Sequence, residues 1–196
     1  MREIFKLTVM LAIICSAAAT ALALVYNLTK DPIAYQQRLK KLSAIRAVQP
    51  DYDNEPDKDF VDLKTNGGAG GDGELTRFYI TKKGSAYTGV VFAVSAVGYG
   101  GPIELMVGIN PEGDITGIRI LKHSETPGLG AKINEASFLN QFASKNTRNT
   151  NWALKKDGGE IDQISGATIS PRAVAEAIHQ GLLFFSEHKE DILKRG

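Results

Sequence analysis

A long segment without charge near the amino terminus limits most strongly what this chain can fold into. Residues 7–29 contain no charged side chain and are mainly aliphatic. About 20 consecutive apolar residues are enough for a helix to cross the hydrocarbon core of a bilayer. We therefore predict a single transmembrane helix over 7–29, preceded by a short tail over 1–6.

The same segment also admits a cleaved signal peptide. Ala-x-Ala triplets of the kind cut by signal peptidase occur within residues 17–23. The apolar character continues beyond them to Leu28, which favours a retained anchor over a removed signal. Arg2 and Lys6 favour a cytoplasmic tail, so that the main domain is expected outside the cytoplasm.

Cysteine and histidine are too few for most metal-dependent redox chemistry. The single cysteine, Cys15, lies in the apolar segment, so the chain cannot build a disulfide, an iron–sulfur cluster or a thiolate zinc site alone. We expect His179 and His188 on the solvent side of the last helix, and His123 as a structural residue or a contact at a cofactor's edge. The net charge of +1 argues against a nucleic-acid partner. Any redox role therefore depends on an organic cofactor or on a partner's metal.

Three connecting segments follow the apolar stretch. Apolar residues at helical spacing predict a juxtamembrane helix over 30–50 that packs on its own domain. The acidic segment 51–59 lacks the spacing of an EF-hand and is predicted to be a solvated loop. The glycine-rich segment 67–73 lacks the Gly-Lys-Ser/Thr of a P-loop, and we expect it to be a loop between strands.

From residue 75 the hydrophobic period changes to two, which is typical of strands. Turn residues between the alternating segments predict three hairpins, which pair 75–82 with 86–96, 103–109 with 114–121, and 152–155 with 160–164. A helix is expected over 131–145, and a second one after residue 170 with Val174, Ile178, Leu182 and Phe185 on one face. The predicted fold is an α+β domain over 51–196, with a mostly antiparallel sheet flanked by helices.

Two glycine-rich loops and one corner stand out as candidate ligand sites. The glycines of 98–101 would let the backbone approach a ligand, or they would serve only a tight crossover. The corner Asp162–Pro171 ends in Ser170, a good N-cap, and Pro171, a good first helical residue. Thr168 would then precede a helix N-terminus, where a phosphate is stabilised. An ordinary strand-to-helix corner is the alternative.

Several segments in this order resemble the RnfG family, the flavin-carrying G subunits of the Rnf ion-translocating electron-transport complex. They are the anchor, Gly-Tyr-Gly-Gly-Pro-Ile, His-Ser-Glu-Thr-Pro-Gly-Leu-Gly and Asp-Gln-Ile-Ser-Gly-Ala-Thr. The resemblance covers nearly the whole chain. The C subunit of the sodium-translocating NADH:quinone reductase is related through its FMN domain, but this chain lacks long extra segments after the anchor.

The resemblance implies an FMN-binding domain with covalent FMN. The last hydroxyl of the motif, that of Thr168, would carry FMN through a phosphoester bond. The other residues assigned by the resemblance are Asp162, Ser165, Gly166 and Ala167 in the attachment motif, and Glu125, Thr126, Gly128, Leu129 and Gly130 in a second flavin loop. No pattern indicates a catalytic acid, base or nucleophile, or a metal site, so the chain itself is expected to be an electron carrier.

The family further implies partners and a location. The complex passes electrons between ferredoxin and NAD while moving sodium ions or protons across the inner membrane, through subunits with flavins and iron–sulfur clusters. A flavin transferase would move FMN from FAD onto Thr168, and the domain would be periplasmic. Two alternatives stay open: an exported free-standing FMN reductase with residues 1–23 removed, and a cofactor-free binding domain on a membrane anchor.

Overall fold

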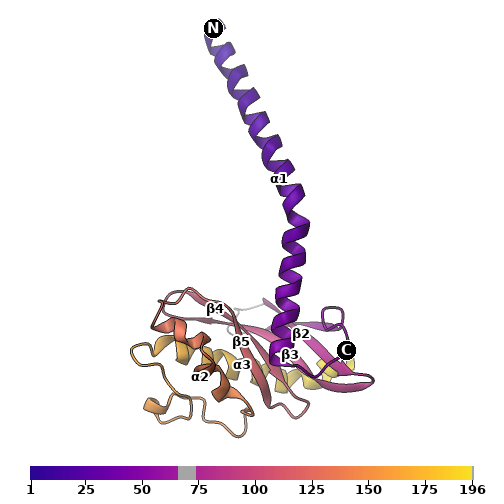
Figure 1. Cartoon of the computed structure of the whole chain (residues 1–196), viewed down its shortest axis with the longest axis vertical. Coiled ribbons are helices and arrows are strands. Elements are labelled where there is room, and N and C mark those ends of the chain that lie inside the picture. The colour runs from indigo at the N-terminus through magenta and orange to yellow at the C-terminus, as the bar shows by residue number, and fades with distance from the viewer. Residues whose placement is uncertain (66–73, 196) are drawn as a thin grey trace. The chain divides into compact units, whose positions relative to one another are not determined.

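The computed structural model describes residues 1–65 and 74–195 (Figure 1). The predicted glycine loop over 67–73 lies outside the described residues. By their internal contacts the residues form two compact units, Met1–Lys41 and Leu42–Gly196.

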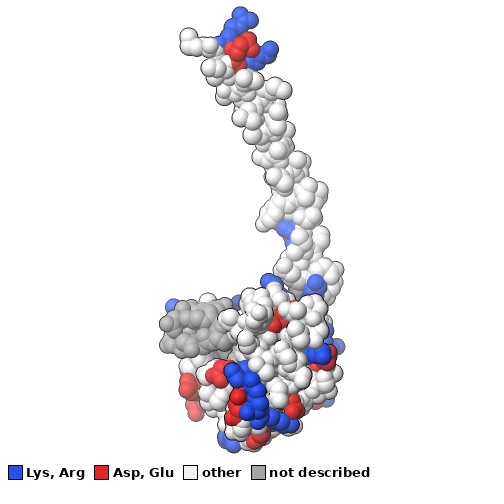
Figure 2. Space-filling view, turned by 90° about the vertical axis from the view of Figure 1, so that its left-hand side faces the viewer, with Lys and Arg blue, Asp and Glu red and all other residues white. Residues whose placement is uncertain are grey.

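The helix α1 spans Arg2–Val48 and contains both predicted amino-terminal helices in one continuous element. Charged side chains gather at its amino-terminal end, and the stretch that follows shows none on the face seen in Figure 2. Its length and composition allow α1 to cross a membrane, and they would also suit a signal sequence. Pro32, which lacks the donor for the helical ladder, lies inside α1 where the apolar stretch has ended.

A five-stranded antiparallel sheet forms the centre of the second unit. Its strands are β1 (Phe60–Thr65), β2 (Glu74–Lys83), β3 (Ala86–Val97), β4 (Pro102–Ile109) and β5 (Ile115–Lys122), and their order in the sheet is their order in the chain. The first two predicted hairpins are confirmed, β2 with β3 and β4 with β5. The α+β class with a mostly antiparallel sheet is confirmed as well.

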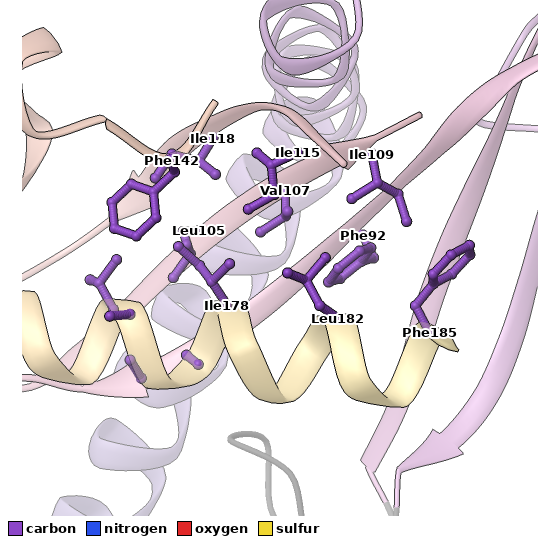
Figure 3. Packing of buried hydrophobic residues seen from close by; sticks show 14 of the residues in the cluster. Phe92, Leu105, Val107, Ile109, Ile115, Ile118, Phe142, Ile178, Leu182 and Phe185 are labelled. Atoms are coloured by element: carbon purple, nitrogen blue, oxygen red, sulfur yellow. The ribbon is translucent and has the colours of Figure 1, made fainter. Parts of the chain in front are cut away.

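The helix α3 (Ile169–Arg195) covers one face of this sheet (Figures 1 and 3). Its predicted apolar stripe is buried against strand residues such as Phe92 and Leu105. Gly181 brings helix and sheet into close contact, because a Cβ there would lie 2.6 Å from the Phe92 ring. The main core therefore lies between α3 and the sheet.

The carboxyl-terminal end of α1 covers part of the opposite face. Ala44, Ile45 and Val48 pack against Tyr79, Val91 and Met106 of the sheet in a second, smaller core. Leu42 onward thus belongs with the sheet, and this end of α1 is packed on its own domain as predicted.

Two sequence predictions are wrong. The segment 131–145 is not one helix but three short turns, η1 (Gly130–Asn134), α2 (Ala136–Leu139) and η2 (Asn140–Phe142). Asparagine and serine compete for backbone hydrogen bonds and weaken a helix, and no side chain caps these turns.

The third hairpin is replaced by a turn, η3 (Lys155–Asp157), and by one isolated parallel bridge between Leu154 and Ile161. Both residues of that bridge are buried. Their apolar side chains supply the main core and do not extend a sheet, which is why the alternating pattern was misleading.

Candidate functional site

The attachment corner predicted from the sequence is a tight turn that leads into α3. The Ala167 N–H donates to the Ile164 carbonyl at 3.0 Å, which closes the turn. Gly166 has a φ of +78°, a conformation that strains any residue with a Cβ. Ser165 and Gly166 are exposed, while Ile164 is buried. The core therefore anchors the corner, and its tip is open to solvent.

Thr168 is the residue immediately before α3. Its carbonyl accepts a hydrogen bond from the Arg172 N–H at 3.3 Å, which is the first bond of the helical ladder and defines an N-cap. Its side chain is half-buried. The first-turn N–H groups and the positive end of the helix dipole therefore lie beside its hydroxyl.

The prediction that Ser170 is the N-cap is wrong, because the helix begins at Ile169 and Ser170 lies inside its first turn. Ser170 is only 1 % exposed. Its hydroxyl donates to Oε2 of Glu125 at 2.5 Å. A buried carboxylate takes the hydroxyl that the sequence pattern had assigned to the helix end.

Glu125 joins three segments that are far apart in the sequence. Besides Ser170, its carboxylate accepts a hydrogen bond from the Gly100 N–H, at 3.0 Å from Oε1. The side chain is 5 % exposed. The two predicted glycine loops and the attachment corner therefore meet at one carboxylate.

Glycines surround that carboxylate on two sides. A Cβ on Gly98 would lie 2.2 Å from Oε1 of Glu125, and a Cβ on Gly130 would lie 2.3 Å from Oε2. A Cβ on Gly100 would lie 2.2 Å from the Ser124 carbonyl oxygen. The glycines of the 98–101 loop thus allow close approach to the neighbouring loop of the same chain.

The second loop turns at the surface beside the corner. The Thr126 carbonyl accepts from the N–H groups of Leu129 and Ala131, both at 3.2 Å. Gly128 has a φ of +76°. The Leu129 side chain is 45 % exposed, and its Cδ2 would lie 3.2 Å from a Cβ on Gly166. The structure therefore brings the two motif segments side by side.

Exposed apolar side chains lie on all three segments. Tyr99, Leu129 and Ile169 are 75 %, 45 % and 50 % exposed. Such residues suit contact with a flat apolar ring or with another protein. The sequence analysis had not singled out Tyr99 or Ile169, since a lone apolar residue in a turn shows no periodicity.

Asp162, the acidic position of the motif, is exposed and pairs with Lys155 at 2.7 Å. Arg172 of α3 pairs with Asp157 at 2.6 Å. Both ion pairs connect η3 with the two ends of the corner. Exposed pairs of this kind contribute little stability, so their geometry matters more than their energy.

The three histidines have structural contacts. Nδ1 of His123 accepts the Glu125 N–H at 3.2 Å. His179 stacks on Trp152 with ring centroids 5.4 Å apart, and His188 stacks on Phe184 at 4.2 Å. The prediction that the latter two face solvent is wrong, because both are half-buried against aromatic rings. Within residues 1–65 and 74–195 no three His, Cys, Asp or Glu side chains gather as a metal site would require.

Family comparisons agree with this geometry. An FMN-binding domain model matches residues 98–183, which contain all three segments that meet at Glu125. A model of the RnfG N-terminal region matches residues 1–48. The G subunit of the ion-translocating oxidoreductase complex of Aliivibrio fischeri (strain MJ11) is 36% identical over 195 residues, covering 96% of this chain and 93% of the relative. The chain belongs to the RnfG family of ion-translocating oxidoreductase complexes.

Another RnfG relative and one solved structure extend the comparison. The corresponding G subunit of Cereibacter sphaeroides (strain ATCC 17023) is 36% identical over 191 residues, which are 94% of this chain and 85% of that one. The crystal structure of Shewanella oneidensis NqrC has a TM-score of 0.52 at 19% identity, covering 70% of this chain and 75% of that chain. At this identity the similarity to NqrC concerns the fold alone.

Proposed function

We propose that this RnfG family chain carries electrons within a membrane-bound ion-translocating oxidoreductase, through FMN joined to Thr168 by a phosphoester bond. The observation that supports this most directly is the position of Thr168. Its hydroxyl lies at the N-cap of α3, on an open corner inside the segment that the FMN-binding domain model matches. FMN, when bound, exchanges electrons one or two at a time.

The attachment needs a co-substrate and an enzyme. With FAD as donor, Oγ1 of Thr168 forms a bond to the phosphorus of the FMN half while the diphosphate bond to AMP breaks. AMP leaves, and the hydroxyl proton passes to a base of the flavin transferase. The exposed Ser165 and Gly166 leave room for that enzyme, and the helix N-terminus offsets the charge of the phosphodiester.

The second loop and the exposed apolar residues would hold the ring. Leu129 lies next to Gly166, so an FMN tethered at Thr168 has this side chain within its reach. Tyr99 and Ile169 add apolar surface on the neighbouring segments. Backbone N–H groups of the loop that includes Thr126, Gly128 and Gly130 would stabilise negative charge on the reduced ring.

The membrane and partner assignments follow from the family. We place α1 in the inner membrane as a single retained span, with the FMN domain in the periplasm. The partners would be the other membrane subunits, which carry flavins and iron–sulfur clusters between ferredoxin and NAD. A covalent tether suits a periplasmic domain, because a dissociated cofactor would be lost there.

Intact mass and in-gel fluorescence of the denatured full chain test the attachment. Protein produced with a competent flavin transferase should gain one FMN less one water and fluoresce. Thr168→Ala should abolish both signals. Ser165→Ala is the matched control, because it removes the other hydroxyl of the motif and should keep the flavin. An unmodified wild-type mass would overturn the proposal, and a labelled Thr168→Ala protein would overturn the site.

A further inference from the structure

We propose that Glu125 is a positioning residue that holds the attachment corner and the two glycine loops together, and that it acts without touching the flavin. This inference rests on the proposed attachment of FMN to Thr168. It assigns to the chain a buried hydrogen-bonded link on which the geometry of the flavin site depends.

The contacts of Glu125 support an internal role. The side chain is 5 % exposed, and each carboxylate oxygen already accepts a hydrogen bond. The donors are the Gly100 N–H, 25 residues away in sequence, and the Ser170 hydroxyl, 45 residues away. Among the described residues no Lys, Arg or His forms an ion pair with this carboxylate. The two neutral donors therefore provide the hydrogen bonds that a buried carboxylate requires.

The surrounding backbone fixes the carboxylate in place. Gly98 and Gly130 approach it so closely that neither position has space for a Cβ. Gly130 also has the Ser170 hydroxyl 3.0 Å from where its Cβ would be. The carboxylate and the two glycines therefore form one packed unit.

The link acts on the attachment site through α3. Ser170 lies two residues after Thr168 in the first turn of the helix. Its bond to Glu125 fixes how that turn is rotated relative to the second loop. Leu129, which lies beside Gly166, is carried by the same loop as Glu125. Without the link we expect the corner and the loop to separate, so that the Thr168 hydroxyl and the surface for the ring lose their common geometry.

The conservative variant separates geometry from charge. In Glu125→Gln the amide oxygen can accept from the Gly100 N–H, and the amide NH₂ can donate to the Ser170 oxygen. Both bonds are then kept while the charge is lost. Glu125→Ala removes both bonds, and Ser170→Ala removes one of them.

The test uses the full chain in detergent, first without flavin and then with FAD and a flavin transferase. We expect Glu125→Ala to slow FMN transfer about tenfold or more, because small misplacements of a reacting group have effects of this size. Glu125→Gln should stay within about twofold of wild type, and Ser170→Ala should fall between them. The double variant Glu125→Ala/Ser170→Ala should be no slower than Glu125→Ala, because both changes remove the same link.

A second measurement reports the position of the bound flavin. Visible circular dichroism of the tethered flavin should be strong in wild type and in Glu125→Gln, and weakened in Glu125→Ala. A wild-type transfer rate and dichroism in Glu125→Ala would overturn the inference. An equal loss in Glu125→Gln and Glu125→Ala would also overturn it, since charge and not geometry would then be responsible.

Two controls keep this test separate from the proposed function. Transfer to wild type and its absence in Thr168→Ala establish the attachment whatever Glu125 does. If Glu125→Ala fails to fold, as judged by far-ultraviolet circular dichroism, Ser170→Ala decides. A wild-type transfer rate in a folded Ser170→Ala protein would then overturn the link.

Discussion

Thr116 on β5 donates its hydroxyl to the carbonyl of Val48, at 2.6 Å, and this bond joins the last residue of α1 to the sheet. The neighbouring strands make room for the contact. Gly108 and Gly117 pair across β4 and β5, and a Cβ on Gly108 would lie 2.6 Å from the same Val48 oxygen. The helix that carries the apolar segment thus ends in a socket of two glycines and one hydroxyl.

Removing the hydroxyl should weaken this junction. We expect Thr116→Val to lower the free energy of unfolding by about 1 kcal/mol, the net contribution of one hydrogen bond. Denaturant unfolding followed by Trp152 fluorescence reports it, because the chain has one tryptophan and this residue is buried in the sheet domain. Ser85→Ala, which removes an exposed turn hydroxyl, should change stability by less than about 0.5 kcal/mol. Equal effects of the two variants would contradict the assignment.

Truncation in the main core should have a larger effect. Leu182 is 2 % exposed on the buried face of α3, where it packs in the main core with Phe92 and Phe185 (Figure 3). Leu182→Ala leaves a cavity and should cost about 2–5 kcal/mol. Glu187→Ala is the surface control on the same helix and should be nearly neutral. A loss below about 1 kcal/mol for Leu182→Ala would show that the interface between α3 and the sheet closes over the gap.

Local patterns in the sequence predict those parts of the fold whose cause is local. The β4–β5 hairpin follows from the Asn-Pro-Glu-Gly turn, where the Gly113 N–H donates to the Asn110 carbonyl at 3.0 Å. The apolar stripe of α3 follows from its helical spacing. In both cases neighbouring residues determine the structure, so reading along the chain is sufficient.

The missed features depend on distant residues. Ser170 has the chemistry of an N-cap, but Glu125, 45 residues earlier, takes its hydroxyl, and Thr168 occupies the cap position instead. His179 is polar and was expected on the surface, yet it stacks on Trp152 from another segment. The sequence identified both motif segments of the site, but their meeting at a buried carboxylate is a long-range fact with no local pattern.

The stability of the β4–β5 turn should depend on pH through Asp114. Hydrogen bonds from Asn146, at 2.6 Å, and from Asn110, at 3.3 Å, hold the pKa of this carboxyl below its ordinary value. A carboxyl with a lowered pKa in the folded state stabilises the fold above its unfolded pKa, near 3.8, and loses that contribution as the pH falls through the folded value. We therefore expect the stability advantage of wild type over Asp114→Asn to be full near neutral pH and to shrink below about pH 4. Urea midpoints measured across this range check it, and an advantage that stays constant with pH would contradict it.

Gly166 and Gly113 allow backbone strain to be separated from site geometry. Both have positive φ angles, +78° and +94°, so an alanine at either position should cost about 1–2 kcal/mol of stability. A Cβ on Gly113 meets nothing within 4 Å, whereas one on Gly166 would lie 3.2 Å from Leu129 in the second loop. We therefore expect similar losses of stability in the two variants, but slower FMN attachment only in Gly166→Ala. Transfer from FAD, followed by in-gel fluorescence at a temperature where both variants are folded, measures the difference. Equal transfer rates would mean that the corner tolerates displacement from the second loop, and the close fit between Gly166 and Leu129 would then have no part in attachment.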